Sequence, residues 1–149
     1  MEITRETDYA IRCVLFLSMN PEKTCMVGEI ADKQGVPKAF LAKILQKLVK
    51  RNIVTSIRGV KGGFQLAKTP GNISLIDVIE AVSGPVSLNV CVIDRKNCER
   101  SGHCSVHPIW VDLQEDFEGK LKKINFKKLA DNEKALFEGK KKKTKRRRA

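Results

Sequence analysis

The sequence predicts a mainly α-helical fold with one small β-hairpin, and three observations lead to this prediction. Helical patterns over residues 27–34 and 37–51 are joined by the tight turn Gly35-Val36-Pro37, which is the layout of a helix-turn-helix unit. A two-residue periodicity follows at residues 53–67, as expected for a hairpin that forms a wing. A long amphipathic helix is predicted over residues 105–124. The predicted fold class is therefore a winged helix-turn-helix domain followed by a long dimerisation helix.

Length and composition limit the classes of protein to consider. With 149 residues, of which 42% are hydrophobic, the chain can form one globular domain plus a short appendage. No apolar run approaches the ~18 residues that a membrane span requires, and charged residues interrupt any secretory segment at the amino end. We therefore expect a cytoplasmic protein with no membrane partner. Only two histidines and no nucleophile motif are present, so we do not expect an enzyme.

The helices that precede the hairpin are predicted from their apolar positions. The first helix is capped by Thr4 or Thr7 and runs to about Met19, before Asn20-Pro21. Ala31 in the second helix and Gly35 in the turn are both small. They are expected to let the second and third helices approach each other closely. The third helix has an apolar stripe at a spacing of three to four residues that should face the core: Leu41, Ile44, Leu45 and Leu48.

The third helix and the hairpin carry the residues that we expect to contact DNA. A recognition helix presents side chains to base edges in the major groove, and the polar residues predicted to face outward for this task are Lys38, Lys43, Gln46 and Lys47. Arg58 and Lys61 fall at the tip of the hairpin, where a cation can meet a phosphate or enter the minor groove. The glycines of this turn lack the spacing and the Gly-Lys-Ser/Thr end of a nucleotide-binding loop.

The distribution of charge supports a polyanionic partner. The formal net charge is +12, and the stretch from Lys33 to Lys68 contains nine cations and no acidic residue. Solvated helix faces usually interleave Glu with Lys, whereas a surface that contacts phosphates benefits from cations alone. We expect a double-stranded DNA operator, with RNA as an alternative. The basic segment KKKKTKRRR, residues 140–148, is expected to be disordered.

A fourth, short helix is predicted over residues 74–82, and Ser83-Gly84-Pro85 ends it. We divide the chain into a winged domain (1–84), a cysteine-rich loop (85–104), a dimerisation helix and C-terminal helix (105–135), and a disordered basic tail (136–149). The long helix has one apolar stripe that a compact winged domain would leave uncovered, so a second copy of the chain is expected to cover it. Such a homodimer would suit a palindromic operator.

Three of the five cysteines gather on one polar loop. Cys91, Cys98 and Cys104 are separated by six and five residues, and His107 follows shortly after. Disulfides are rare in reducing compartments, which leaves a metal site or redox chemistry. Three thiolates and an imidazole can hold a zinc ion or an iron–sulfur cluster, and the wide spacing favours the cluster. A cluster-free thiol switch is a further alternative. Cys13 and Cys25 are expected to serve packing.

Several of these segments resemble the Rrf-type winged-helix family of transcriptional regulators. The resemblance covers residues 1 to about 135, and its matching pieces are Thr7-Asp8-Tyr9-Ala10, the helix-turn-helix around Gly35, Val54-Thr55-Ser56-Ile57-Arg58-Gly59 with Gly62-Gly63, Asp77-Val78-Ile79, the three-cysteine loop and Trp110. It implies a homodimeric regulator, expected to be a repressor, that binds a 2Fe–2S or 4Fe–4S cluster through the three cysteines and senses redox state or nitric oxide. The fourth ligand implied is His107, or Asp8 of the partner subunit.

Overall fold

The computed structural model describes the backbone of residues 3–148 and the side chains of residues 3–138. It is mostly helical with one two-stranded antiparallel sheet, so the predicted helical fold with a small β-wing is confirmed. In chain order the elements are α1 (Arg5–Met19), α2 (Val27–Gln34), α3 (Lys38–Lys50), β1 (Val54–Ile57), β2 (Gly63–Leu66), the 3₁₀ turn η1 (Pro70–Asn72), α4 (Leu75–Ser83), α5 (Val90–Ile93), the 3₁₀ turns η2 (Arg95–Asn97) and η3 (Glu99–Gly102), α6 (His107–Lys123) and α7 (Phe126–Arg148).

The helix-turn-helix forms as predicted, but Gly35 has a different role from the one expected. Gly35 caps α2 with φ 62° and ψ 38°, the left-handed conformation that favours glycine. A Cβ added at this position would meet nothing within 4 Å. Gly35 is therefore required for the direction of the turn, whereas close helix approach depends on Ala31, which is 4% exposed.

The wing is a four-pair hairpin in which Val54 is opposite Leu66 and Ile57 is opposite Gly63. Gly62 is needed because a Cβ there would collide with the carbonyl oxygen of Ile57. A Cβ on Gly63 would lie 2.5 Å from the carbonyl oxygen of Cys25, since residues 25 and 64 pair as a β-bridge. This bridge fastens the hairpin to the segment between α1 and α2.

The main core lies where α1, α2, α3, α4 and the wing meet. Leu17 of α1 and Leu41 and Leu45 of α3 are at most 1% exposed, as the apolar spacing predicts. Phe126, at the start of α7, is fully buried in the same core. A smaller cluster joins α4 to the carboxyl end of α6: Ile76, Ile79, Val86 and Leu121.

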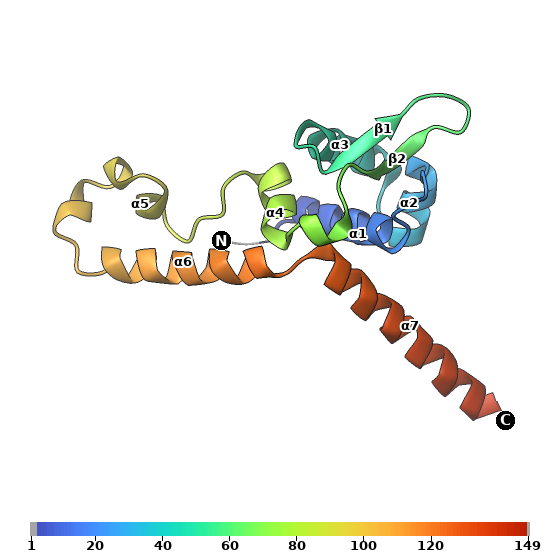
Figure 1. Ribbon diagram of the computed structural model, residues 1–149. Helices are drawn as coiled ribbons and strands as arrows, with labels where there is room; N and C mark the ends of the chain where they lie inside the picture. The colour runs from blue at the N-terminus through green and yellow to red at the C-terminus, as the bar shows by residue number, and fades with distance from the viewer. Residues whose placement is uncertain (1–2, 149) are drawn as a thin grey trace.

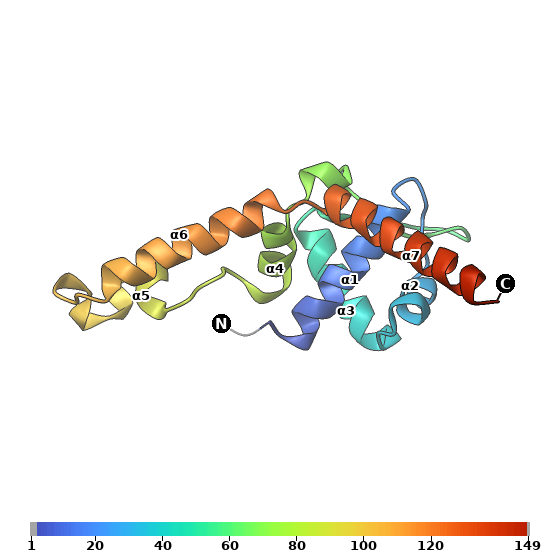
Figure 2. The same cartoon turned by 90° about the horizontal axis from the view of Figure 1, so that it is seen from below.

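Outside the winged body the chain is extended. The carboxyl end of α6 lies at the winged body, and the helix extends away from it. Its amino end lies far from the body, near α5 (Figures 1 and 2). The cysteine-rich segment, predicted to be a loop, contains α5 and the two short turns η2 and η3. Side-chain caps explain these turns, because Asn89 Oδ1 accepts from the amide of Val90 and Asp94 Oδ1 accepts from the amide of Lys96.

The carboxyl end also differs from the prediction. Residues 136–148, expected to be disordered, continue α7 to Arg148. Lys and Arg are good helix formers, and the docked first turns of α7 provide the nucleus that an isolated basic segment lacks. Residues 1, 2 and 149 lie outside the described residues. Nowhere in the described part of the chain is a helix both long enough and apolar enough to cross a bilayer.

Candidate nucleic-acid interface and cysteine loop

The outer face of α3 is the first part of the candidate interface. Its inner residues Ile44, Leu45 and Leu48 are fully buried, which fixes the rotation of the helix about its axis. Lys38, Lys43 and Gln46 consequently lie on the exposed face. Among side chains of residues 3–138 neither lysine takes part in an ion pair, so both ammonium groups are available to a phosphate or a base edge.

Lys47 differs from the other predicted contacts. Its ammonium group lies 2.6 Å from Glu6 Oε1 and donates to the carbonyl oxygen of Val82 at 3.1 Å. The side chain therefore joins α3 to α1 and the end of α4. Nothing in the sequence around Lys47 signals this, because Glu6 is 41 residues away.

The wing tip forms the second part of the interface. Arg58 and Lys61 are both exposed on either side of a turn in which the amide of Gly62 donates to the carbonyl oxygen of Gly59 at 2.9 Å. Val60 is fully exposed at the same tip and was not singled out from the sequence. The sequence signal for Val60 is an apolar residue placed between two cations, Arg58 and Lys61, at the tip of a hairpin. It is suited to contact with a groove wall or sugar edge.

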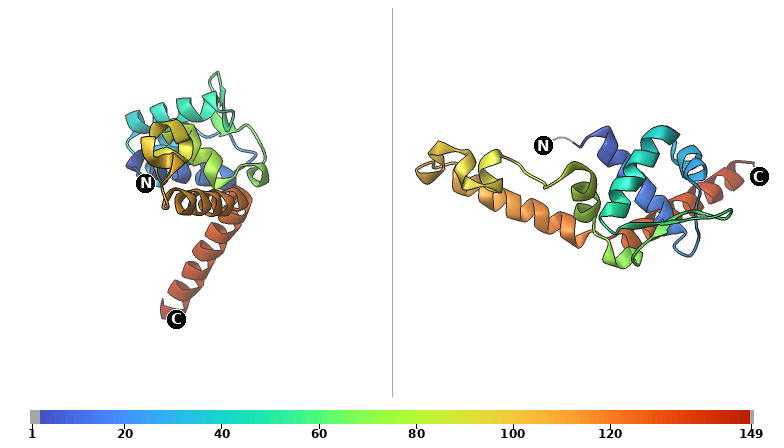
Figure 3. Two further views of the ribbon diagram at one scale, coloured as in Figure 1. Left: turned by 90° about the vertical axis from the view of Figure 1, so that its left-hand side faces the viewer. Right: turned by 90° about the horizontal axis from the view of Figure 1, so that it is seen from above.

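Both parts of the interface lie on one side of the molecule. In Figures 1 and 3, α3 and the wing occupy the same edge of the winged body, away from α6 and α7. The stretch from Lys33 to Lys68 contains nine cations and no acid, although Lys47 pairs with Glu6 and Arg51 and Lys68 lie beside acids of α4. The arrangement can place a helix in a major groove while the hairpin reaches the adjacent backbone.

The cysteine loop has few buried anchors. Between residues 87 and 104 only Cys91 and Ser101 are buried, and Cys98 and Cys104 are partly exposed. Ser101 Oγ donates to the carbonyl oxygen of Arg95 at 2.8 Å, and Arg95 Nη2 donates back to the carbonyl oxygen of Ser101 at 3.2 Å. These local bonds shape the loop without packing it on the body.

The predicted ligands are not gathered around a point. Within the described residues no three His, Cys, Asp or Glu side chains form a group that could hold a metal ion. Asp8 lies on α1 and pairs with Arg12 at 2.8 Å. His107 begins α6, and its Nδ1 atom is buried with no hydrogen-bond partner in the described part of the chain. Buried polar atoms normally have a partner, so this nitrogen is an unused donor or ligand beside the loop.

Gln114 attaches the loop to α6 and was missed by the sequence reasoning. It is 5% exposed. Its Nε2 donates to the carbonyl oxygen of Val86 at 2.7 Å, and its Oε1 accepts from the amide of Leu88 at 2.9 Å. Its sequence signal is its position: Gln114 lies one helical turn from both Trp110 and Phe117, so it is a polar residue within the apolar stripe of the helix. Any movement of the start of the loop is therefore coupled to α6.

The apolar stripe of α6 is only partly covered. Leu121 is buried against α4, but Ile109 is 56% and Leu113 is 45% exposed. Val106 at the start of the helix is also exposed. The uncovered residues recur at three- and four-residue steps and so share one face.

The remaining two cysteines belong to the core. Cys13 and Cys25 are fully buried, as their expected packing role requires. Burial, followed by the nearby Cys25 thiol, raises the pKa of the Cys13 thiol to about 12. Burial also raises the pKa of the Cys25 thiol. Both thiols are therefore unreactive in the folded protein at neutral pH.

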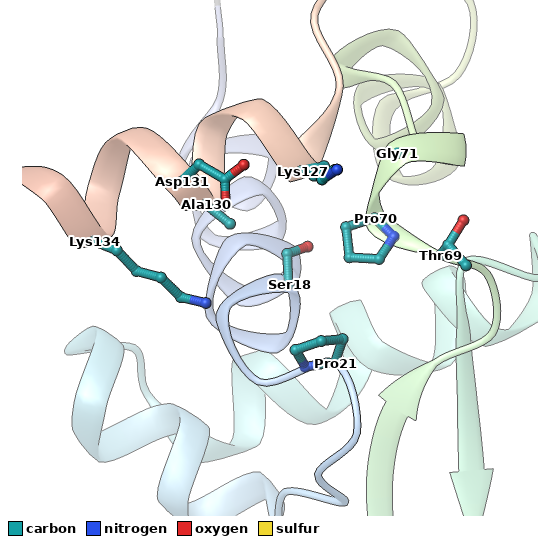
Figure 4. Close-up of a pocket in the computed structure, with 9 residues that line it drawn as sticks. All are labelled: Ser18, Pro21, Thr69, Pro70, Gly71, Lys127, Ala130, Asp131 and Lys134. Carbon is teal, nitrogen blue, oxygen red and sulfur yellow. The ribbon is translucent and has the colours of Figure 1, made fainter.

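A pocket of about 430 Å³ lies between the end of α1, η1 and α7 (Figure 4). Ser18 and Lys134 line it from opposite sides. The Ser18 hydroxyl donates to the carbonyl oxygen of Val14 at 2.6 Å and so needs no further partner. The one buried polar side chain of this lining is therefore already satisfied and is not directed at a ligand.

Comparison with known proteins identifies the family. Residues 3–132 match the Rrf2 family, described as an iron-dependent transcriptional regulator. The chain is 31% identical to the HTH-type transcriptional regulator IscR of Klebsiella pneumoniae over 137 residues, which are 91% of this chain and 83% of the relative. The relatives are transcriptional regulators, a non-enzymatic function that requires DNA binding.

Solved structures share the fold. CymR, the global cysteine regulator of Bacillus subtilis, superposes with a TM-score of 0.73 at 22% identity, covering 89% of this chain and 98% of that one. IscR of T. potens gives a TM-score of 0.71 at 23% identity, covering 91% and 90%. The recognition helix α3 and the wing are the elements expected of such a regulator, and the family match spans residues 3–132. The chain belongs to the Rrf2 family of DNA-binding transcriptional regulators.

Proposed function

We propose that this protein is a homodimeric repressor whose affinity for a palindromic operator depends on an iron–sulfur cluster held by the cysteine loop. One observation carries the proposal: three thiols share a sparsely anchored loop with a buried imidazole nitrogen that has no partner in the described chain. Thiolate sulfur and imidazole nitrogen are the ligands that 2Fe–2S and 4Fe–4S clusters use in proteins. The donor set therefore fits such a cluster.

Cys91, Cys98 and Cys104 are the proposed thiolate ligands. For the fourth position the structure favours His107 over Asp8, because Asp8 already has an ion-pair partner in Arg12. When bound, a cluster would supply a redox-active iron–sulfur centre that oxidants or nitric oxide can attack. With only Cys91 and Ser101 buried between residues 87 and 104, little packing opposes a rearrangement of the loop around its ligands.

Gln114 links the cysteine loop to α6, and α6 in turn connects the loop to the DNA-contacting helices α3 of the dimer. Its two hydrogen bonds to residues 86 and 88 couple the loop to α6, and the exposed face of α6 is the proposed contact between two copies. In the dimer a shift of α6 changes the separation of the two α3 helices. A difference of ~1.4 kcal/mol between the loop states changes operator affinity tenfold.

Lys38, Lys43 and Gln46 are proposed to enter the major groove. Lys47 is proposed to contact the DNA beside them, although it is also paired with Glu6. Arg58 and Lys61 are proposed to contact the backbone or the minor groove. Support comes from the position of α3 and the wing on one side of the molecule and from the exposure of these side chains, of which only Lys47 is half-buried.

The fourth ligand is tested by anaerobic reconstitution of His107→Ala and Asp8→Ala, with iron, sulfide and visible absorbance measured. We expect His107→Ala to lose or alter the absorbance and Asp8→Ala to retain it. His103→Ala is the matched control, because His103 is exposed on the same loop. The reverse pattern would assign the position to Asp8.

A thiol-based switch without a cluster is the second candidate, and a zinc site is the third. The thiol switch is favoured by one finding: the described cysteines do not gather around a metal position, and Cys98 and Cys104 are accessible. CymR of Staphylococcus aureus, which shares the fold at 20% identity, has been solved in an oxidised form. The thiol switch predicts operator binding that is insensitive to iron chelation and reversed by reductant. Stoichiometric zinc in a colourless protein would support the third candidate.

A further inference from the structure

Helix α7 leaves the winged body soon after it starts. Phe126 is fully buried and Ala130 is 2% exposed, but residues 131–138 are exposed apart from half-buried Glu133. The helix has 23 residues and is therefore about 34 Å long. In Figures 1 and 3 it projects from the side of the body that lies opposite α3 and the wing.

The distal half of this helix is strongly basic. Residues 140–148 contain eight Lys or Arg and no acid, so they carry eight of the formal net charge of +12. Like charges three and four residues apart on a helix repel each other. A polyanion placed along these turns would remove that repulsion and release its own counterions.

The sequence of the segment indicates which polyanion it would bind. Between Glu138 and Arg148 there is no apolar residue, whereas a helix that lies on a membrane surface needs an apolar face beside its cations. A duplex DNA backbone requires charge alone for sequence-independent binding. DNA is also the polymer that the winged domain already holds, which raises its concentration near α7.

We propose that residues 140–148 bind a second segment of duplex DNA, distinct from the operator that α3 and the wing contact. The two cationic surfaces are separated by the winged body, so one straight duplex cannot lie against both. The protein would then hold two DNA segments together, or pass from one segment to another. This role is independent of the cysteine loop and does not require a cluster.

A capture assay tests the proposal. A protein chain ending at Glu138 is used to select a tightly bound duplex from a random DNA library. Binding of the selected duplex therefore does not depend on the basic segment. The selected duplex is fixed to beads and saturated with full-length protein, and a fluorescent random-sequence duplex is added. We compare the full chain with the chain ending at Glu138 and with a full-length variant in which lysines 140–143 are changed to Gln. The matched control changes four other exposed lysines to Gln: Lys120, Lys123, Lys127 and Lys128.

Capture should fall at least about tenfold in both tail variants, and affinity for the selected duplex should stay within about twofold. The salt dependence of capture should flatten by about 3 to 4 units when four phosphate contacts are lost. The control variant should capture normally. Unchanged capture in the tail variants would overturn the proposal. So would equal losses of capture and of selected-duplex affinity, or competition by single-stranded RNA that exceeds competition by duplex DNA.

Discussion

The winged domain and the cysteine loop are built on opposite principles. In the winged domain every inward position of α3 is at most 1% exposed, and the core fixes the orientation of the outward lysines. Between residues 87 and 104 the loop buries only Cys91 and Ser101, and most of its hydrogen bonds join near neighbours. The first region is held by a continuous core, whereas the second is held mainly by local caps and hydrogen bonds. The proposed control of DNA binding by the loop requires this division, because the part that contacts DNA must hold its shape while the loop rearranges.

The reactivity of the five thiols gives the largest contrast between the two regions. In cluster-free, reduced protein, iodoacetamide should modify Cys98 and Cys104 at least about 10³ times faster than Cys13 and Cys25, because the core thiols react only after global opening. Mass spectrometry after brief labelling measures the ratio. Equal labelling of Cys13 and Cys98 would mean that the winged core is not closed.

Removing side-chain volume should have very different effects in the two regions. Leu45 is fully buried, so Leu45→Ala should lower the free energy of unfolding by about 2–5 kcal/mol. Ile93→Ala in the loop removes an aliphatic side chain that is 59% exposed, and it should change stability by less than about 0.5 kcal/mol. Urea unfolding of both variants provides the comparison. Similar losses would contradict the proposed difference in packing.

Within the winged domain, the wing tip can be tested against a nearby cation. Arg58→Ala should weaken operator binding by about 1–3 kcal/mol without changing stability. Arg51 lies in the same basic stretch but beside Asp77 and Glu80, so Arg51→Ala serves as the matched control with a smaller effect. Fluorescence anisotropy with a labelled duplex measures both. If the two variants bind alike, the wing does not contribute through Arg58.

Alkaline pH should destabilise the winged domain through Cys13. The pKa of this thiol is about 12 when folded and 9.0 in the reference state. Because the folded pKa is raised, the stabilisation is complete below pH 9 and is lost progressively between pH 9 and 12. Wild-type protein should therefore lose about 1–2 kcal/mol more than Cys13→Ala between pH 8 and 10.5. Urea titrations at the two pH values test this, and parallel losses would show that Cys13 is accessible to water.

The smallest expected effect separates two neighbouring lysines of α3. Lys43 is exposed and unpaired among residues 3–138, whereas Lys47 is held by Glu6 and the carbonyl oxygen of Val82. Lys43→Ala should lower operator affinity severalfold. Lys47→Ala should lower affinity less and cost under about 1 kcal/mol of stability. Affinity losses of equal size would show that DNA draws Lys47 away from Glu6.

The sequence predicts the winged domain well because its elements are determined by local periodicity. The stripe at Leu41, Ile44, Leu45 and Leu48 gives both the helix and its buried face, and the alternation after Asn52 gives the hairpin. The position of Lys47 could not be predicted, because its partner Glu6 is distant in sequence. Gly35 was assigned a packing role, although a glycine directly after a helix is itself a signal for a left-handed cap.

Prediction was weaker outside that domain for a physical reason. Residues 140–148 look disordered when judged by charge alone, but α7 is nucleated by Phe126, which is buried against α1. The short turns of the cysteine loop depend on single caps from Asn89 and Asp94. The ligand set was selected from spacing, and the unpartnered Nδ1 of His107 became visible only in three dimensions.

We propose that a cofactor held by the loop thiols controls the spacing of the two recognition helices, α3, in the dimer. The most direct test is operator affinity, measured anaerobically, for wild-type protein with and without reconstituted iron and sulfide. The same pair of measurements is made on a variant with Cys91, Cys98 and Cys104 all changed to Ser. We predict that the wild type carries iron and sulfide and changes affinity about tenfold on loading, and that the variant carries neither and does not respond. Wild-type protein free of iron and sulfide under strict exclusion of air, with the same affinity as the variant, would contradict the account.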